Sequence, residues 1–163
     1  LTHKAMEIGY NPEMILAGRR INDRMGEYIA DSTISEMNKA GINPEGAKVA
    51  VFGLTFKENC SDLRNTKVTS IIDYLNQYKC DVMVTDAYAD ETEAKNIYNI
   101  DLQDLNQIHH VDAVILAVSH DQYKSMQLEE WQNIFNTKGI FIDVKSIYDN
   151  DFFSNTNISH WRL

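Results

Sequence analysis

Four short runs of hydrophobic residues, separated by helical patterns, constrain the fold of this chain more than any other feature of its sequence. The runs are too short to be helices and lack regularly alternating polar positions, so each is predicted to be a strand buried on both faces. Strands of this kind form a parallel sheet covered by helices on both sides. The sequence therefore predicts an open, doubly wound, Rossmann-like α/β domain over residues 44–163. The predicted strands are Lys48–Phe52, Asp81–Thr85, Ala113–Val118 and Gly139–Val144, and the longer predicted helices are Val68–Tyr78 and Asp90–Tyr98.

Residues 1–43 form a separate helical region in the sequence pattern. A short helix is predicted first, then a break at Gly9–Pro12, then one long helix over Pro12–Ala40 that Gly41 closes. This length favours an oligomer-forming or domain-bridging helix, with a helix that crosses the core of its own domain as the alternative. Because the chain begins with Leu1 inside a helical pattern, we expect it to be a piece of a longer protein. One stripe of the long helix contains Met14, Gly18, Ile21, Met25 and Tyr28.

The composition argues against several classes of partner. The 15 basic and 24 acidic residues give a net charge of −9, and no run of Lys or Arg supplies the cationic surface that nucleic-acid phosphates need. The two cysteines have no zinc-ligand spacing and indicate no disulfide framework. No hydrophobic run approaches the roughly 20 residues that span a bilayer. We therefore expect no nucleic-acid partner, no membrane partner, no metal site and a cytoplasmic location.

The loop after the first predicted strand is the expected ligand site, because open parallel sheets bind ligands beyond the carboxyl ends of their strands. This loop, residues 53–66, is long for a strand-to-helix connection and carries Lys57 and Arg64 in an otherwise acidic chain. Lys57 can act as a point charge on a phosphate, and Arg64 can donate two parallel hydrogen bonds to one. Phe56 offers a flat face to a base or a sugar. The alternative is a solvated loop in which Arg64 only pairs with Asp62.

No dinucleotide fingerprint follows the first strand. Gly53 lacks further glycines at the GxGxxG spacing, and Asp86, after the second strand, is interpreted as a capping or loop residue rather than a ribose ligand. Adjacent side chains do not converge as a catalytic triad must, so Ser119–Asp121, with His120 at its centre, is predicted to be a loop. Cys60 lies beside acidic residues that disfavour a thiolate, so it is not predicted to be a nucleophile.

Several segments resemble a known family. Val51–Asn59 (VFGLTFKEN), followed by Asp62–Thr66 (DLRNT), is similar to the C-terminal UDP-binding domain of the UDP-glucose/GDP-mannose dehydrogenase family. Ala17–Asp23 (AGRRIND) resembles the central dimerisation helix of that family, and Trp161–Leu163 fits the end of such a chain. The residues after the loop arginine are most similar to the branch that oxidises UDP-N-acetylhexosamines for surface polysaccharides such as capsule.

The resemblance implies an NAD-dependent UDP-sugar 6-dehydrogenase in the full-length protein. Such an enzyme oxidises a C6 alcohol to the acid with two hydride transfers and a thiolate-bound intermediate. In the family, the catalytic cysteine and the NAD-binding domain come first, so they would lie upstream of Leu1. This chain alone is therefore expected to be inactive. The resemblance also implies a homodimer through the helices of residues 1–43, with UDP-sugar binding in residues 44–163.

The resemblance further implies contacts for individual residues. Phe56 and Lys57 match positions that contact the UDP-sugar, and Arg64 matches a position that reaches the NAD. Arg20 belongs to a family motif on the central helix and is expected on the substrate side, without an individual contact. Lys145, after the fourth predicted strand, falls near a cation that contacts substrate in related enzymes.

Two alternatives stay open from the sequence. One is a UDP-glucose 6-dehydrogenase of the same family, because sugar selectivity lies partly outside this region. The other is a non-enzymatic regulatory α/β module that binds a nucleotide, such as a receiver domain. A receiver would carry a phosphoacceptor aspartate after its third strand, whereas this chain has Ala117–His120 there.

Overall fold

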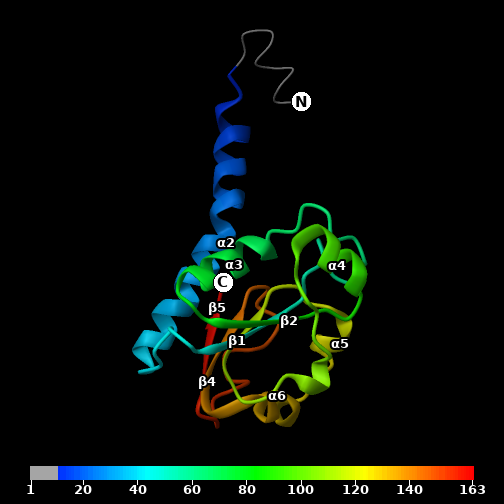
Figure 1. Ribbon diagram of the computed structural model, residues 1–163. Helices are drawn as coiled ribbons and strands as arrows, with labels where there is room; N and C mark the ends of the chain where they lie inside the picture. Colours follow the sequence, from blue (N-terminus) through cyan, green and yellow to red (C-terminus); the bar gives the residue numbers. More distant parts are fainter. Residues whose placement is uncertain (1–10) are drawn as a thin grey trace.

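The computed structural model describes residues 11–163, and its central feature is a five-stranded sheet in which all neighbouring strands are parallel (Figure 1). The strand order is β2-β1-β3-β4-β5, so the chain moves from β1 to one edge and then crosses back to β3. This is the predicted open, doubly wound α/β fold. The short helix expected before Gly9 lies outside the described residues. The strands are β1 (Lys48–Phe52), β2 (Asp81–Thr85), β3 (Val111–Leu116), β4 (Phe135–Asp143) and β5 (Ile158–Arg162), and the helices are α2 (Glu13–Lys39), α3 (Val68–Gln77), α4 (Glu91–Tyr98), the 3-10 helix η1 (Leu105–Gln107), α5 (Asp121–Lys124) and α6 (Leu128–Ile134).

Helices cover both faces of the sheet, as the continuous hydrophobic strands predict. Along β1, Val49 and Val51 belong to one hydrophobic core with α2 and α3. Ala50 and Phe52, the alternate residues, belong to a second core with α5 and α6. Successive side chains of a strand point to opposite faces, so a strand between two helical layers must be hydrophobic at every position.

The long helix α2 has two different halves. Its C-terminal half buries Ile29, Ile34 and Met37 against the domain, whereas its N-terminal half projects away from it (Figure 1). On the projecting half, Met14 is 90% exposed and Ile21 is 65% exposed. The second half therefore packs into the core of its own domain. On the first half, Met14 and Ile21 of the hydrophobic stripe are left uncovered by the part of the chain that the structure describes, whereas Met25 packs against the core.

The end of β3 differs from its predicted position. The strand covers Val111–Leu116 rather than continuing to Val118. The amides of Ala117 and Val118 both donate to the carbonyl of Phe52, at 2.9 and 3.1 Å. Two donors on one acceptor break the regular ladder, so the chain leaves the sheet at this point.

The sequence does not predict the fifth strand. β5 pairs in parallel with Gly139–Asp143 of β4, and its Trp161 lies near Tyr28 of α2, with ring centroids 6.2 Å apart. The segment Trp161–Leu163, interpreted from the sequence as a chain end, thus contributes its first two residues to the sheet. Within residues 11–163, no helix combines the length and the hydropathy needed to cross a bilayer.

Candidate functional site

A cavity of about 400 Å³ opens at the carboxyl ends of β1, β3 and β4. Its walls come from the loop after β1, from α2, from the start of α3 and from the residues that follow β3 and β4. The chain leaves β1 and β3 toward opposite edges of the sheet. The cavity therefore lies at the topological switch point, where open α/β sheets bind their ligands.

Three lysines line this cavity: Lys67, which pairs with Asp23, and two that come from different strand ends. Lys57 comes from the loop after β1, and Lys145 follows β4. Neither ammonium group forms an ion pair with another residue of the described range, 11–163. Phe56, which is 58% exposed, lies at the same cavity. In a chain with a net charge of −9, two unpaired cations at one cavity favour an anionic ligand.

The loop after β1 begins with a glycine that the local geometry requires. Gly53 has a φ of +94°, and a Cβ placed there would lie 2.4 Å from the Cβ of Val118. Only glycine adopts this conformation without strain, and only glycine leaves room for the Val118 side chain. The ends of β1 and β3 therefore approach closely beside the cavity.

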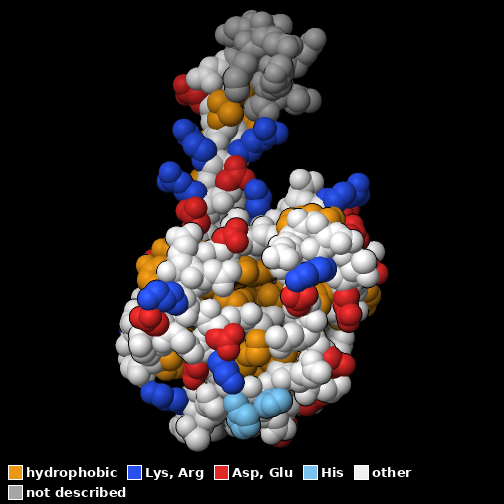
Figure 2. All heavy atoms as spheres, in the orientation of Figure 1, with side chains coloured by type: hydrophobic (Ala, Val, Ile, Leu, Met, Phe, Trp, Pro, Cys, Tyr) orange, Lys and Arg blue, Asp and Glu red, His pale blue; other side chains and the backbone are white. Residues whose placement is uncertain are grey.

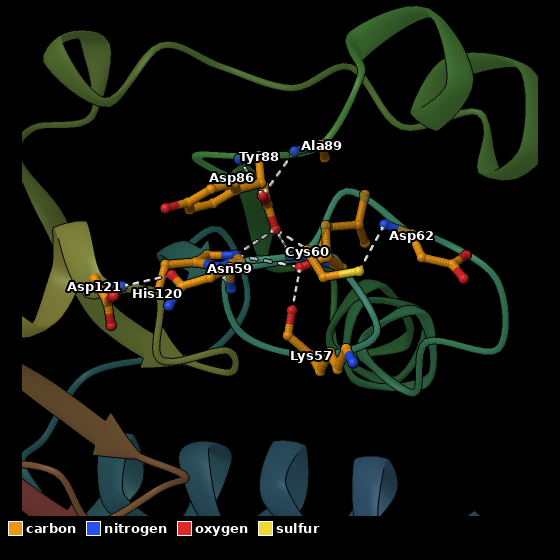
Figure 3. Close-up of polar contacts among 11 residues, drawn as sticks. Lys57, Asn59, Cys60, Asp62, Asp86, Tyr88, Ala89, His120 and Asp121 are labelled. Atoms are coloured by element: carbon orange, nitrogen blue, oxygen red, sulfur yellow. Dashed lines mark hydrogen bonds and ion pairs between the residues drawn. The ribbon is translucent and has the colours of Figure 1, made fainter.

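A buried carboxylate, Asp86, organises the same loop from the end of β2. One of its oxygens accepts hydrogen bonds from the amides of Leu54 and Thr55, at 2.6 and 3.0 Å. The other accepts from the amides of residues 88–89 in the turn before α4 (Figure 3), so Asp86 is a loop residue, one of the two roles that the sequence left open, whereas the cap of α4 is Asp90. Burial opposes ionisation, but these bonds and one with His120 outweigh it and hold the pKa of Asp86 below its usual range.

His120 lies in the predicted loop, but its side chain is fully buried and is the partner of Asp86. Its Nε2 atom lies 3.1 Å from Asp86 Oδ2 and 3.2 Å from Thr55 Oγ1. Its Nδ1 atom accepts a hydrogen bond from the Asn59 amide at 2.9 Å. Sequence spacing does not predict these contacts, because the partners lie 34 to 65 residues away. The one available signal is that each polar group follows a hydrophobic strand, and these strands end at one edge of the sheet.

The loop after β1 does not fit a dinucleotide. A pyrophosphate bound in the Rossmann manner needs free backbone amides at this turn. The amides of Leu54 and Thr55 instead donate to Asp86. The Asp86 side chain is itself fully buried, so it cannot face a ribose. We therefore assign no NAD-binding turn to the end of β1 and derive no chemical step through NAD.

Arg64 lies on the exposed surface of the loop, outside the cavity wall. It donates from Nε to Asp62 Oδ1 at 2.9 Å and from Nη2 to Asp62 Oδ2 at 2.7 Å, and its side chain is 77% exposed. The side-chain hydrogen bond lowers the pKa of Asp62 to about 2. The pairing that the sequence left open as an alternative is thus present. In this pairing Arg64 lies beside Phe56 and Asn65 at a second, more open depression. The expected contact of Arg64 with NAD stays a prediction.

Arg20 is not brought to the cavity. It is exposed on the projecting half of α2, in a depression shared with Met14 and Ala17. Figure 2 shows basic side chains on both flanks of this half of the helix. Farther along α2, Asn22 and Gly26 reach the cavity instead. The expected substrate contact of Arg20 stays a prediction.

The cysteines show no catalytic or metal-binding arrangement within the described residues. Cys60 is half-buried, and its sulfur accepts a hydrogen bond from the Asp62 amide at 3.4 Å. Burial raises the pKa of the Cys80 thiol. No group of three or more His, Cys, Asp or Glu side chains in residues 11–163 is arranged to hold a metal ion.

Comparisons with known proteins identify relatives of this chain. Protein CapL of Staphylococcus aureus is 48% identical over all of this chain. The UDP-N-acetyl-D-glucosamine 6-dehydrogenase of Salmonella typhi is 43% identical over 90% of it. The chain spans 38% and 35% of the lengths of these two relatives.

Solved structures share the architecture. The NDP-N-acetyl-D-galactosaminuronic acid dehydrogenase of Methanosarcina mazei superimposes on 90% of this chain with a TM-score of 0.81 and 22% identity, and the match covers 30% of that protein. The UDP-D-ManNAc dehydrogenase of Pyrococcus horikoshii gives a TM-score of 0.69 and 26% identity over 87% of this chain and 32% of its own. Residues 50–150 match the UDP binding domain of the family that the loop motif predicts. The chain belongs to the UDP-glucose/GDP-mannose dehydrogenase family.

Proposed function

We propose that this chain is the UDP-sugar-binding, C-terminal part of an NAD-dependent UDP-N-acetylhexosamine 6-dehydrogenase that serves surface polysaccharide synthesis. The observation that carries the proposal is the cavity at the switch point of a UDP-binding domain, lined by two unpaired lysines from different strand ends. The choice of sugar is supported by two relatives, of Salmonella typhi and Pseudomonas aeruginosa, that are UDP-N-acetyl-D-glucosamine 6-dehydrogenases and are 43% and 42% identical to this chain.

In this proposal, Lys57 and Lys145 hold the diphosphate of the UDP-sugar. An ammonium group binds phosphate as a point charge, and neither lysine has to give up a carboxylate partner within residues 11–163 to do so. Phe56 packs against the base or the sugar at the cavity rim. Binding energy from the diphosphate, remote from the reacting carbon, then positions C6 for oxidation.

The oxidation itself is placed in other parts of the longer protein. We expect the catalytic cysteine and the NAD-binding fold upstream of Leu1, because Cys60 and Cys80 lack the surroundings of a nucleophile and the turn after β1 does not fit a dinucleotide. The purified chain alone should therefore not reduce NAD with any UDP-sugar. Two unpaired cysteines are in keeping with a reducing, cytoplasmic compartment.

Steady-state kinetics of the complete enzyme tests the assigned lysines. Lys57→Ala and Lys145→Ala should each raise the KM for UDP-sugar roughly tenfold or more, because a lost hydrogen bond to a charged group costs about 1.5–3 kcal/mol. Arg64→Ala should chiefly raise the KM for NAD. Lys79→Ala, which removes an exposed lysine paired with Glu45, is the matched control and should change neither constant.

Unchanged UDP-sugar affinity in both cavity variants would contradict the proposed site. If Arg64→Ala abolished UDP-sugar binding while Lys57→Ala left it intact, the two loop cations would have the opposite roles. Comparing UDP-N-acetylglucosamine, UDP-N-acetylmannosamine and UDP-glucose as substrates tests the choice of sugar. A clear preference for UDP-glucose would favour the alternative activity of the same family.

We also propose that the projecting half of α2 forms a homodimer contact. Met14 and Ile21 are largely exposed there, and a Cβ at Gly18 would meet nothing within 4 Å among the described residues, so a second backbone can approach closely. Sedimentation of the complete enzyme tests this contact. Ile21→Asp should shift the dimer toward monomer, whereas Glu27→Gln, an exposed polar change on the same helix, should not. A wild-type monomer at high concentration would refute the proposal.

A further inference from the structure

The imidazole of His120 holds the loop that carries Lys57 at two points. Its Nδ1 atom accepts from the Asn59 amide at 2.9 Å. Its Nε2 atom lies 3.2 Å from Thr55 Oγ1 and 3.1 Å from Asp86 Oδ2. The Thr55 hydroxyl in turn donates to the Lys57 carbonyl at 3.2 Å. Figure 3 shows the ring enclosed between Asp86 and this loop.

These contacts determine which ring nitrogen carries the proton. Because Nδ1 accepts from the amide of Asn59, it is unprotonated, and the proton of the neutral ring lies on Nε2. Nε2–H then donates toward both Asp86 and Thr55. The Thr55 oxygen accepts this bond and keeps its own hydrogen for the Lys57 carbonyl. One neutral imidazole therefore satisfies all of these contacts at once.

Asn59 is tied to the loop after β3 in two ways. Its amide donates to His120, and its side-chain Oδ1 accepts from the Asp121 amide at 3.0 Å. Its φ of +55° is uncommon for a residue other than glycine, so the surrounding bonds must hold it there. The side chains between the two anchors, residues 56–58, are exposed and line the cavity. The loop is thus fastened on both sides of the segment that faces the ligand.

We infer that His120 is a positioning residue of the UDP-sugar site. It holds Thr55 and Asn59, so that Lys57 stays at the cavity. The inference rests on the proposed function of this cavity. His120 is fully buried and is not part of the cavity lining, so it acts through the loop and not by touching the ligand. A loop without this anchor would sample other conformations, and the ligand would then have to order it on binding.

Two replacements in the complete enzyme separate the two ring nitrogens. The longer side chain of His120→Gln places its amide near the Nε2 position and can still donate to Asp86, but it leaves the Asn59 amide without an acceptor. The shorter side chain of His120→Asn places its oxygen near the Nδ1 position and can still accept from Asn59, but it leaves Asp86 without the ring donor. The first variant should loosen the loop of residues 53–66. The second should remove a hydrogen bond that stabilises the buried carboxylate of Asp86.

The two variants should therefore differ in kinetics and in stability. His120→Gln should raise the KM for UDP-sugar roughly tenfold, the effect of one lost hydrogen bond, with kcat within about a factor of three of wild type. His120→Asn should raise this KM less and lower the melting temperature more. Thr55→Val, which removes the hydroxyl link between His120 and Lys57, should also raise the KM and serves as the second variant if His120→Gln does not fold.

Gln122→Ala is the matched control. It shortens an exposed side chain two residues from His120 and leaves the bonds of Asn59 in place, so its kinetic constants should equal those of wild type. A wild-type KM in folded His120→Gln or in Thr55→Val would overturn the positioning role. The positioning role would also be overturned if both His120 variants lost folded protein and kcat to the same extent while their KM for UDP-sugar stayed at the wild-type value. A wild-type enzyme that neither binds nor oxidises UDP-sugars would instead overturn the proposed function.

Discussion

Replacing Gly26 with alanine tests how closely α2 and α3 pack beside the cavity. A Cβ at this position would lie 2.8 Å from the Ser70 Cβ and 3.0 Å from the Lys67 carbonyl oxygen. Both atoms belong to the first turn of α3 or its cap, and neither moves when a side chain rotates. The added methyl group therefore pushes α3 away from α2, next to the cavity wall that Gly26 itself lines.

The expected loss of stability is the difference between two opposing effects. Overpacking a well-packed contact costs about 1–3 kcal/mol. Replacing glycine by alanine within a helix returns about 1 kcal/mol. We therefore expect a net loss of about 1 kcal/mol in the free energy of unfolding. For a chain of this size, that corresponds to a fall of about 2–4 °C in Tm.

Urea denaturation followed by circular dichroism measures this difference. Gly18→Ala is the matched control, because a Cβ at Gly18 meets nothing within 4 Å among the described residues and only the gain in helix propensity remains. Removing the opposing Cβ, in the double variant Gly26→Ala with Ser70→Gly, should recover part of the loss as a favourable coupling energy. A Gly26→Ala protein as stable as the Gly18→Ala protein, or strictly additive effects in the double variant, would refute the close contact.

Two further predictions concern buried polar groups. Tyr148→Phe removes a hydroxyl that accepts from Trp131 Nε1 at 2.9 Å and donates to the Tyr123 carbonyl at 2.6 Å, so the free energy of unfolding in urea should fall by about 1–3 kcal/mol. The control Tyr88→Phe removes the hydroxyl of a tyrosine that is 43% exposed, and it should leave the free energy of unfolding unchanged. Because the pKa of Asp86 is lowered in the folded protein, its stabilising effect is present above the unfolded value of about 3.9 and is lost as the pH falls toward the folded one. Asp86→Asn should therefore flatten the acid limb of a plot of unfolding free energy against pH, and a slope equal to that of wild type would contradict this assignment.

The hydrophobic runs predict four of the five strands: β1 and β3 are almost completely buried, and β2, although it is an edge strand like β5, keeps a hydrophobic run (Val82–Val84). Burial on both faces leaves a continuous pattern that is visible in the sequence. β5 is an edge strand, and its residues Ile158–Arg162 (ISHWR) mix hydrophobic and polar side chains. Its pairing with Gly139–Asp143 is a long-range contact that no local pattern shows. A short edge strand of this kind cannot be distinguished from a loop by periodicity alone.

The same reasoning explains which site residues could be placed from the sequence. Lys57 and Lys145 each follow a predicted strand, and parallel strands end at one edge of the sheet, so their convergence follows from the fold. Arg20 lies on a helix whose direction relative to the domain depends on tertiary packing. His120 also follows a predicted strand, but its burial depends on the close approach of three loops at the ends of β1, β2 and β3.

The position of Asp86 gives a physical reason for lysines at this site. In a dinucleotide-binding turn, backbone amides after the first strand bind the anionic pyrophosphate. Here a carboxylate of the protein already accepts from the amides of Leu54 and Thr55. The turn is thus filled by an internal anion, and a second anion cannot use the same donors. A nucleotide diphosphate at this sheet edge therefore cannot use these two amides, which favours binding by side-chain cations. Three described lysines line the cavity: Lys57, Lys145 and Lys67, and the ammonium group of Lys67 already pairs with Asp23.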